Sequence, residues 1–252
     1  MTDRTMFTSL QYHFLKRLTK LPSEGGEIYV GKSKILTLLG DKFFDLIRNK
    51  VVIDFGCGHG ESAVEMAQHG PTRVIGVDLQ EKSLAVGRSK AIAAGVQGNC
   101  VFTTASDELA DVIVSIDAFE HFEDPAAILR IMEGLLKPDG TVHVSFGPTW
   151  YHPLGGHLFS IFPWAHLLFR ESALMRWRSD FKSDGATRFG EVAGGLNQMT
   201  IARFERLIAD SPFQFAQMEA VPIRKLRTLH NAMTREFTTA IVRCRLEKRL
   251  NK

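Results

Sequence analysis

Apolar and polar positions divide this chain of 252 residues into a helical start and a longer alternating part. Apolar residues recur at helical spacing in residues 7–21 and 32–48, on either side of Gly25 and Gly26, which predicts two helices. From Val51 onward, short β-branched runs alternate with helix-like segments. The expected strands are 51–55, 73–78, 100–104, 111–116 and 141–146, and the expected helices are 61–68, 80–94 and 125–136. Because such alternation needs crossover connections, it predicts a parallel, doubly wound sheet with helices on both faces.

The last part of the chain continues this pattern after an interruption. Thr200 is the expected cap of a helix over 201–209, and two further strands are expected at 213–221 and 237–245. The interruption, residues 147–199, holds nine of the 24 aromatic residues, which predicts either the core of a lid or the wall of an apolar pocket. Its glycines are the expected hinges of a lid: 147, 155, 156, 185, 190, 194 and 195. Its arginines at 170, 176 and 178 are expected on a solvated helix face, with contact to an acidic substrate as the alternative.

The most specific chemical signal is a glycine-rich turn between the first strand and the first helix of the alternation. Gly56, Gly58 and Gly60 let the backbone turn sharply and approach a ligand closely. The next strand ends at Asp78, at the distance where doubly wound folds bind a ribose. The glycine spacing differs from the dinucleotide fingerprint, and Asp54 would repel a pyrophosphate. The turn therefore indicates an adenosyl cofactor that carries no pyrophosphate.

This arrangement resembles the class I S-adenosylmethionine-dependent methyltransferases. The resemblance implies an α/β fold that is doubly wound and Rossmann-like, with a seven-stranded, mostly parallel sheet. It places the glycine turn beside the methionine part of the cofactor, Asp78 at the ribose hydroxyls and Leu79 near the adenine. Ser106 or Asp107 would face the adenine amine, with the capping of a turn as the alternative for both. The residues expected to bind the cofactor are Asp54, Gly56, Cys57, Gly58, Gly60, Asp78, Leu79, Ser106, Asp107 and Asp117.

The loop after the fourth strand carries a Glu-His pair, Glu120-His121, shortly before the Asp-Pro start of a helix. This segment is similar to the ubiquinone and menaquinone methyltransferase superfamily. His121 is the first candidate for the general base, because a neutral imidazole can accept a proton near neutral pH. His152 and His157 are further candidates. The alternative role of His121 is to pack and orient the loop.

The same loop also resembles a metal-binding motif of small-RNA and ubiquinone-pathway O-methyltransferases. The motif here reads Asp117-x-x-Glu120-His121, and His152 or His157 could supply a second imidazole. Such a set would suit a divalent ion that acidifies a substrate hydroxyl. The first position is Asp where those families commonly have Glu, and Glu-His also occurs in metal-free relatives. Whether the chain has a metal site is left open.

Bulk composition changes this picture little. The net charge of +3 is too small to indicate nucleic-acid binding, although nine Lys or Arg residues gather in 224–252. No apolar run is long enough to span a bilayer, and the start of the chain lacks the apolar core of a signal peptide. Cys57, Cys100 and Cys244 lie far apart, which favours a reducing compartment. We therefore expect a cytoplasmic protein without stable membrane insertion; a homodimer is left open.

Together these features predict one domain over 1–252. It comprises a helical cap (1–50), a cofactor-binding core (51–146), a lid insert (147–199) and a final helix with two strands (200–252). The predicted function is transfer of a methyl group from S-adenosylmethionine, at oxygen, to a small or medium-sized molecule with an apolar or aromatic part. Two alternatives stay open: an enzyme that binds this cofactor for a cyclisation or another pericyclic step, and a binding module that the cofactor stabilises.

Overall fold

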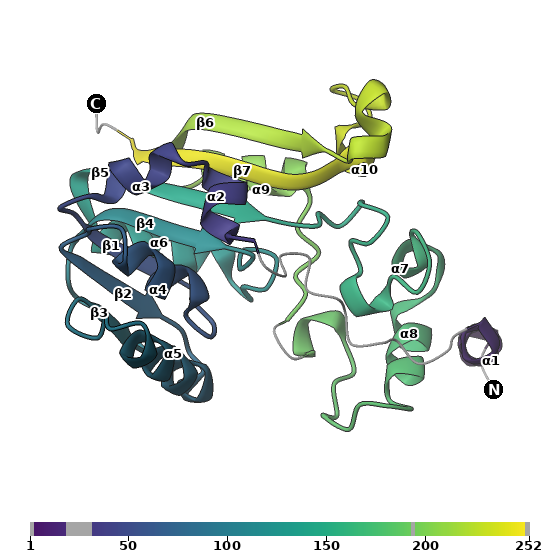
Figure 1. Ribbon diagram of the computed structural model, residues 1–252. Coiled ribbons are helices and arrows are strands. Elements are labelled where there is room, and N and C mark those ends of the chain that lie inside the picture. Colours follow the sequence, from purple (N-terminus) through teal and green to yellow (C-terminus); the bar gives the residue numbers. More distant parts are fainter. Residues whose placement is uncertain (1–2, 19–31, 193–194, 250–252) are drawn as a thin grey trace.

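The computed structural model describes residues 3–18, 32–192 and 195–249, and it contains a seven-stranded sheet in the order β3-β2-β1-β4-β5-β7-β6 (Figure 1). Strands β1 to β5 are parallel, and β7 runs antiparallel to both β5 and β6. The strands are β1 (Val51–Phe55), β2 (Arg73–Val77), β3 (Cys100–Thr103), β4 (Ala110–Ile116), β5 (Leu136–Phe146), β6 (Phe213–Pro222) and β7 (Thr239–Lys248). The predicted α/β architecture, with its seven-stranded and mostly parallel sheet, is confirmed.

Helices cover both faces of this sheet because its central strands are apolar on both sides. In β1, Val52 packs with the helices on one face and Ile53 with those on the other, as the twofold alternation of strand side chains requires. The first face carries α2 (Lys34–Leu39), α3 (Lys42–Ile47), α4 (Glu61–Ala67) and α5 (Glu81–Ala93), and the second carries α6 (Pro125–Leu135) and α9 (Ile201–Ala209). The three cysteines are buried free thiols.

Strand order reverses between β1 and β4, which are neighbours although two strands separate them along the chain. Ligands of open α/β sheets bind at such a reversal, beyond the carboxyl ends of the strands. The helices that follow begin at the capping residues that the sequence indicates. Asp124 accepts a hydrogen bond from the backbone N–H of Ala127 before α6, and Thr200 accepts one from that of Arg203 before α9.

Two predicted boundaries are wrong. The helix expected over 32–48 is broken into α2 and α3, because Gly40 has a φ of 82° and Asp41 then caps a new helix by accepting from the N–H of Lys42. Strand β5 begins at Leu136 rather than 141, since Leu136 already pairs with β4. The predicted break at Gly25 and Gly26 lies outside the described residues.

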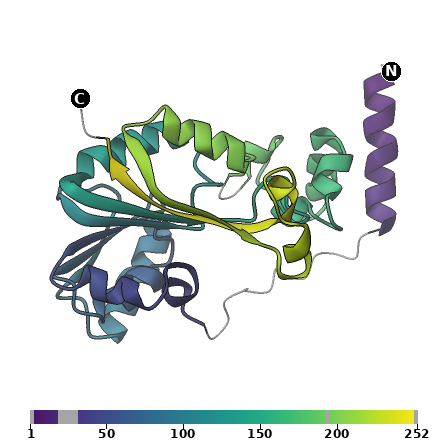
Figure 2. The ribbon, with the colours of Figure 1, turned by 90° about the horizontal axis from the view of Figure 1, so that it is seen from above.

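The lid insert forms a second body beside the sheet, together with the first helix, α1 (Asp3–Leu18) (Figures 1 and 2). Its short helices are η1 (His157–Phe159), α7 (Ala165–Leu168), α8 (Glu171–Arg178) and η2 (Phe189–Glu191). Tyr12 and Leu15 of α1 pack into one apolar core with lid residues that include Phe159, Trp177 and Phe189. Many of the lid aromatics therefore build a core.

The described parts of the expected helical cap separate into two places. Helix α1 contacts the lid through α8, whereas only α2 and the residues just before it reach the carboxyl ends of the parallel strands. The expectation of a solvated helix face fails at Arg178, which is buried and forms two hydrogen bonds with the carboxylate of Asp184. The sequence could not show this pairing, because Asp184 lies beyond the end of α8.

Strands β6 and β7 form the last hairpin of the sheet. Its connection contains a short 3-10 helix, η3 (Arg224–Leu229), and one helical turn, α10 (Arg235–Thr238). Figure 1 shows this connection projecting beyond the sheet at the same end of the molecule as the lid. Within the described parts of the chain, no helix has the length and apolarity needed to cross a membrane.

Candidate functional site

The glycine turn is held tightly by its neighbouring strand. The backbone N–H groups of Gly56 and Cys57 both donate to the carbonyl oxygen of Val77, at 2.8 and 3.1 Å. Gly56, Gly58 and Gly60 have φ values of 79°, 50° and 77°, a region that costs other residues about 1–2 kcal/mol. The glycines are needed at these positions because the turn must reverse direction within five residues.

The three glycines serve different purposes. A Cβ at Gly58 would have no atom within 4 Å, so this glycine faces open space. A Cβ at Gly60 would lie 2.4 Å from the ring of Phe102, and one at Gly56 would lie 2.9 Å from Cβ of Ala118. Gly56 and Gly60 therefore permit close packing, and Gly58 leaves room for a ligand.

Asp78 connects the turn to the end of β2. Its carboxylate accepts hydrogen bonds from the N–H of Gly58 at 2.9 Å and from the N–H of Gln80 at 2.8 Å. These two bonds fix the orientation of the carboxylate at the carboxyl edge of the sheet. This is the position at which the sequence predicts an acid for a ribose.

A cavity of about 600 Å³ opens beside the turn. It is lined by Lys32, Ser33, Lys34, Asp54, Gly56, Cys57, Gly58, His59, Glu61, Ser62, Glu65, Ile116 and Asp117. Its volume is typical of a small-molecule site. Four carboxylates face two lysines in this lining, so the cavity favours a ligand that carries positive charge.

Asp54 is the most unusual group in the cavity. It is only 2% exposed, and its Oδ2 atom has no hydrogen-bond partner among the described residues. Burial, with a smaller contribution from the nearby carboxylates of Asp78 and Glu61, raises the pKa of Asp54 to about 7, although the charge of Lys34 opposes the shift. A buried carboxyl group with an unused oxygen is suited to a cationic partner such as an ammonium group.

This pKa leads to a testable dependence of stability on pH. Between pH 3.8 and about 7, Asp54 keeps its proton in the folded protein and releases it on unfolding. The unfolded state then binds fewer protons, so the free energy of unfolding falls as pH rises through this window, by up to about 4 kcal/mol. We expect urea unfolding of the cofactor-free protein to show this loss relative to Asp54→Asn, which has no carboxyl group to ionise. Parallel pH profiles for the two proteins would contradict the assignment.

Asp117 lines the same cavity and follows directly after β4. Its φ is 52°, its N–H donates to the carbonyl of Ser145, and its carboxylate accepts a hydrogen bond from Nζ of Lys34 at 2.9 Å. This ion pair joins the start of α2 to the loop after β4. The sequence alone does not reveal Lys34, because a single lysine at the start of a helix belongs to no recognisable motif.

Five of the ten residues predicted to bind the cofactor line the cavity: Asp54, Gly56, Cys57, Gly58 and Asp117. Gly60 and Asp78 belong to the surrounding turn. Leu79 is 89% exposed beside it, and Asp107 is also exposed. Ser106 accepts a hydrogen bond from the N–H of Glu108, so it caps a turn, as its alternative role requires.

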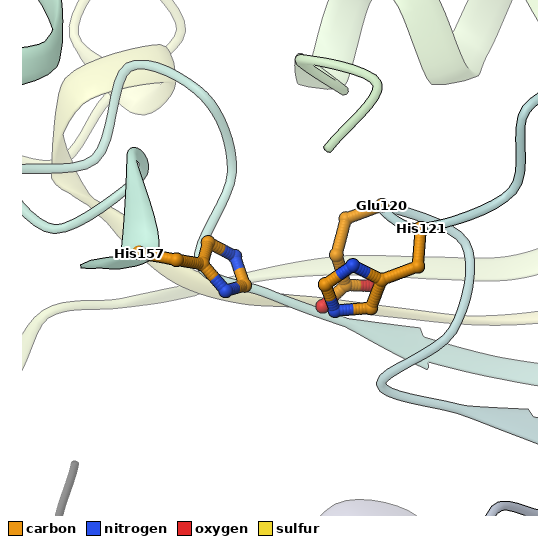
Figure 3. A group of neighbouring side chains, drawn as sticks. All are labelled: Glu120, His121 and His157. Atoms are coloured by element: carbon orange, nitrogen blue, oxygen red, sulfur yellow. The ribbon is translucent and has the colours of Figure 1, made fainter. Parts of the chain in front are cut away.

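A second group of polar side chains lies on the loop after β4 and on the lid (Figure 3). Glu120, His121 and His157 place one potential ligand atom each within 4.8 Å of one another. Glu120 is 2% exposed; its Oε1 accepts from the N–H of Gly147, while its Oε2 has no partner among the described residues. Burial, reinforced by Asp117, raises the pKa of Glu120 to about 8.

The hydrogen bonds of the two histidines determine which nitrogens are available. Nδ1 of His121 lies 2.8 Å from the carbonyl oxygen of Gly195, which can only accept, so Nδ1 carries a proton and the neutral ring has its lone pair on Nε2. His157 has a buried Nε2 without a partner in the described structure. Burial and the neighbouring imidazoles lower the pKa of His157 to about 4, so its ring is neutral. The ring centroids of the two histidines are 5.3 Å apart.

The structure selects among the candidates for a metal site or a general base. Asp117 pairs with Lys34 and does not belong to the group around Glu120. His152 also lies outside this group, and its Nδ1 accepts a hydrogen bond from the N–H of Leu154. Of the predicted set, which comprised Asp117, Glu120, His121 and a second imidazole from His152 or His157, the structure brings together only Glu120, His121 and His157.

Asn197 holds this loop in place, although no motif in the sequence indicates this role. Its side-chain amide donates to the carbonyls of Phe119 and Phe122, and its backbone N–H donates to the carbonyl of Glu120. An isolated Asn at the end of a lid carries no motif. Its role follows only from the contact between the lid and the β4 loop.

Comparison with known proteins agrees with this geometry. The family described as "Methyltransferase domain" matches residues 53–144, which include the glycine turn, Asp78 and the loop after β4. Residues 53–144 of this chain thus match a methyltransferase domain. The ubiquinone biosynthesis O-methyltransferase of Neisseria meningitidis serogroup C is 38% identical over 106 residues, which are 39% of this chain and 44% of that protein. The chain spans about half the length of the curated relatives that it matches.

Solved structures resemble the methyltransferase domain in fold. An S-adenosylmethionine-dependent methyltransferase from Mesorhizobium loti has a TM-score of 0.52 at 18% identity, over 81% of this chain and 92% of that one. The cyclase SpnF has a TM-score of 0.55 at 14% identity, over 84% of this chain and 82% of that one. At these identities the likeness establishes the Rossmann-like fold and does not distinguish between reactions.

S-adenosylmethionine is the cofactor of this class of methyltransferases, and the cavity of the domain fits it. The unused oxygen of buried Asp54 and the open space at Gly58 leave room and a polar partner for the methionine part. The acidic lining suits a ligand with an ammonium and a sulfonium group. The site is therefore compatible with the cofactor that the domain requires.

Proposed function

We propose that this protein transfers the methyl group of S-adenosylmethionine to a hydroxyl oxygen of a small or medium-sized molecule with an apolar or aromatic part. The observation that carries the proposal is that Glu120 and His121, on the loop after β4, lie close to His157 of the lid. The activity by which the curated relatives are named, O-methylation in ubiquinone biosynthesis, supports oxygen as the accepting atom.

In this proposal the glycine turn and its flanking acids hold the cofactor. Asp54 accepts a hydrogen bond from the ammonium group of the methionine part, and Gly58 allows that part to approach the backbone closely. Asp78 accepts hydrogen bonds from the ribose hydroxyls. Bound S-adenosylmethionine supplies a methyl group that its positive sulfur makes electrophilic. The protein contributes mainly by aligning the accepting oxygen and by excluding water.

His121 is the proposed general base. Its Nε2 has an available lone pair, because its Nδ1 is bonded to Gly195 in the lid. This nitrogen can take the proton of the hydroxyl group as the oxygen accepts the methyl group, and neutral His157 beside it does not repel the imidazolium that forms. Because Gly195 belongs to the lid, the position of the lid sets the orientation of the base.

The same three side chains have the composition of a divalent-cation site. Oε2 of Glu120 and Nε2 of His157 are buried without partners in the described structure, and His121 offers a third donor atom. Carboxylate and imidazole ligands suit zinc and related ions. An ion held there would lower the pKa of a bound hydroxyl group and lessen the need for a strong base.

An assay of methyl transfer tests the proposed function. We expect the purified protein, given methyl-labelled S-adenosylmethionine, to label phenols and catechols with apolar substituents and to release one S-adenosylhomocysteine for each product. Matched anilines and thiols serve as controls for the accepting atom. Labelled amines in place of ethers would contradict O-methylation, and a product without S-adenosylhomocysteine would indicate a reaction other than methyl transfer.

A further inference from the structure

The connection between β6 and β7 forms an exposed basic surface that the cofactor site does not use. We call residues 223–234 the hairpin tip. Arg224, Lys225 and Arg227 are all exposed there, within and around η3. No Asp or Glu occurs from 220 to 235, so no acid within the tip neutralises these charges. Three of the nine Lys or Arg residues in 224–252 thus lie together at one projecting point.

Two large aliphatic side chains lie beside these cations in solvent. Met233 is 92% exposed and Leu229 is 58% exposed. The backbone around them is fixed by local bonds: the carboxamide oxygen of Asn231 accepts from the N–H of Met233 at 2.9 Å, and Nδ1 of His230 lies 2.8 Å from the hydroxyl oxygen of Thr238. The fold therefore presents these side chains to water in a defined conformation, beside the three cations.

The hairpin tip lies at the same end of the molecule as the lid. Figure 1 shows η3 and α10 beyond the edge of the sheet, on the side where α7 and α1 also lie. The ring of Phe237, just after the tip, lies 5.2 Å from the ring of Tyr151 in the lid. The helical turn that follows the tip, α10, is thus in contact with the lid.

We propose that the hairpin tip docks the protein on the surface of an anionic lipid bilayer. Met233 and Leu229 would enter the headgroup region, while Arg224, Lys225 and Arg227 contact lipid phosphates. The aliphatic side chains favour a bilayer over a nucleic acid, because they can neither stack on bases nor bond to phosphate. The described helices cannot span a membrane, so the contact is peripheral. This proposal is independent of the reaction at the cofactor site.

Vesicle co-sedimentation tests the proposal. The full protein should bind vesicles made of an equimolar mixture of phosphatidylglycerol and phosphatidylcholine. It should not bind vesicles made of phosphatidylcholine alone. Replacing Arg224, Lys225 and Arg227 together by alanine should weaken binding about a hundredfold, and added salt should weaken the wild type. Met233→Ser should weaken binding about tenfold while leaving the charge unchanged.

A matched control carries alanine at three exposed cations elsewhere, Lys82, Arg130 and Arg206, and has the same net charge as the triple variant. It should bind like the wild type. Failure of the wild type to bind anionic vesicles would overturn the proposal, as would equal binding by the two triple variants. The proposal would also be overturned if the tip variants bound vesicles normally and only Leu10→Glu, on the exposed face of α1, lost binding. The tip would be reassigned to nucleic acid if the wild type bound labelled single-stranded RNA but no vesicles, and if the triple tip variant lost the RNA binding.

Discussion

Replacing Asp78 by alanine is expected to lower the affinity for S-adenosylmethionine at least about a hundredfold. A carboxylate that accepts hydrogen bonds from both ribose hydroxyls contributes about 1.5–3 kcal/mol for each bond to its charged oxygens. The variant also loses the bonds to Gly58 and Gln80 that hold the turn in shape. Both effects weaken the same cofactor site. Titration calorimetry with S-adenosylmethionine and with S-adenosylhomocysteine measures the loss.

Two further variants separate binding from folding. Asp210→Ala removes an exposed acid at the end of α9 and should bind like the wild type. Asp78→Asn keeps one acceptor oxygen and should fall between the wild type and Asp78→Ala. Circular dichroism establishes that each variant is folded before it is titrated. Undiminished affinity in folded Asp78→Ala would show that the cofactor is bound elsewhere.

Replacing His121 by alanine is expected to slow methyl transfer by about 10²–10⁴-fold, the usual contribution of a positioned acid or base. The affinity for S-adenosylmethionine should change little, because His121 does not line the cofactor cavity. Single-turnover kinetics with saturating cofactor isolates the chemical step. The matched control, His13→Ala, removes an exposed histidine of α1 and should leave the rate unchanged. A rate for His121→Ala within about threefold of the wild type would exclude it as the base.

Glu120→Gln and a chelator decide whether the same group works through a metal ion. With a bound ion, the chelator and Glu120→Gln should each slow the reaction strongly, and the chelator should have no further effect on the variant. Without one, the chelator leaves the wild-type rate unchanged. Inductively coupled plasma mass spectrometry of the purified protein gives the metal content directly. These measurements distinguish an ion that acidifies the hydroxyl from a base that acts alone.

The sheet and the glycine turn could be predicted from the sequence because both rest on local patterns. Two short, mainly apolar runs form the first two strands as expected: Val51 to Phe55, which Gly56 follows, and Arg73 to Val77, which Asp78 follows. The helix starts at Pro125 and Ile201 were predictable for the same reason, since each depends on one capping residue. Local sequence thus determines much of the cofactor-binding core.

The rest depends on contacts between distant segments. The pairing of Lys34 with Asp117 joins residues 83 positions apart, and the bond from His121 to Gly195 joins residues 74 apart. The approach of His157 to Glu120 is of the same kind. Residue types made each of these histidines a candidate, but only the path of the lid showed which of them meet. The choice between His152 and His157 could not be made from spacing for this reason.

The packing of α1 on the lid also bears on how the chain folds while it is being made. The hydroxyl of Tyr12 donates to the carboxylate of Asp180, 168 residues later, and fully buried Leu15 belongs to the same apolar core. At about 5–20 residues per second, translation needs roughly 8–34 seconds to bring Asp180 out of the ribosome after Tyr12. During that time the apolar side of α1 has no native partner. The nascent chain therefore leaves the apolar side of α1 exposed to water until the lid residues up to Asp180 have been synthesised.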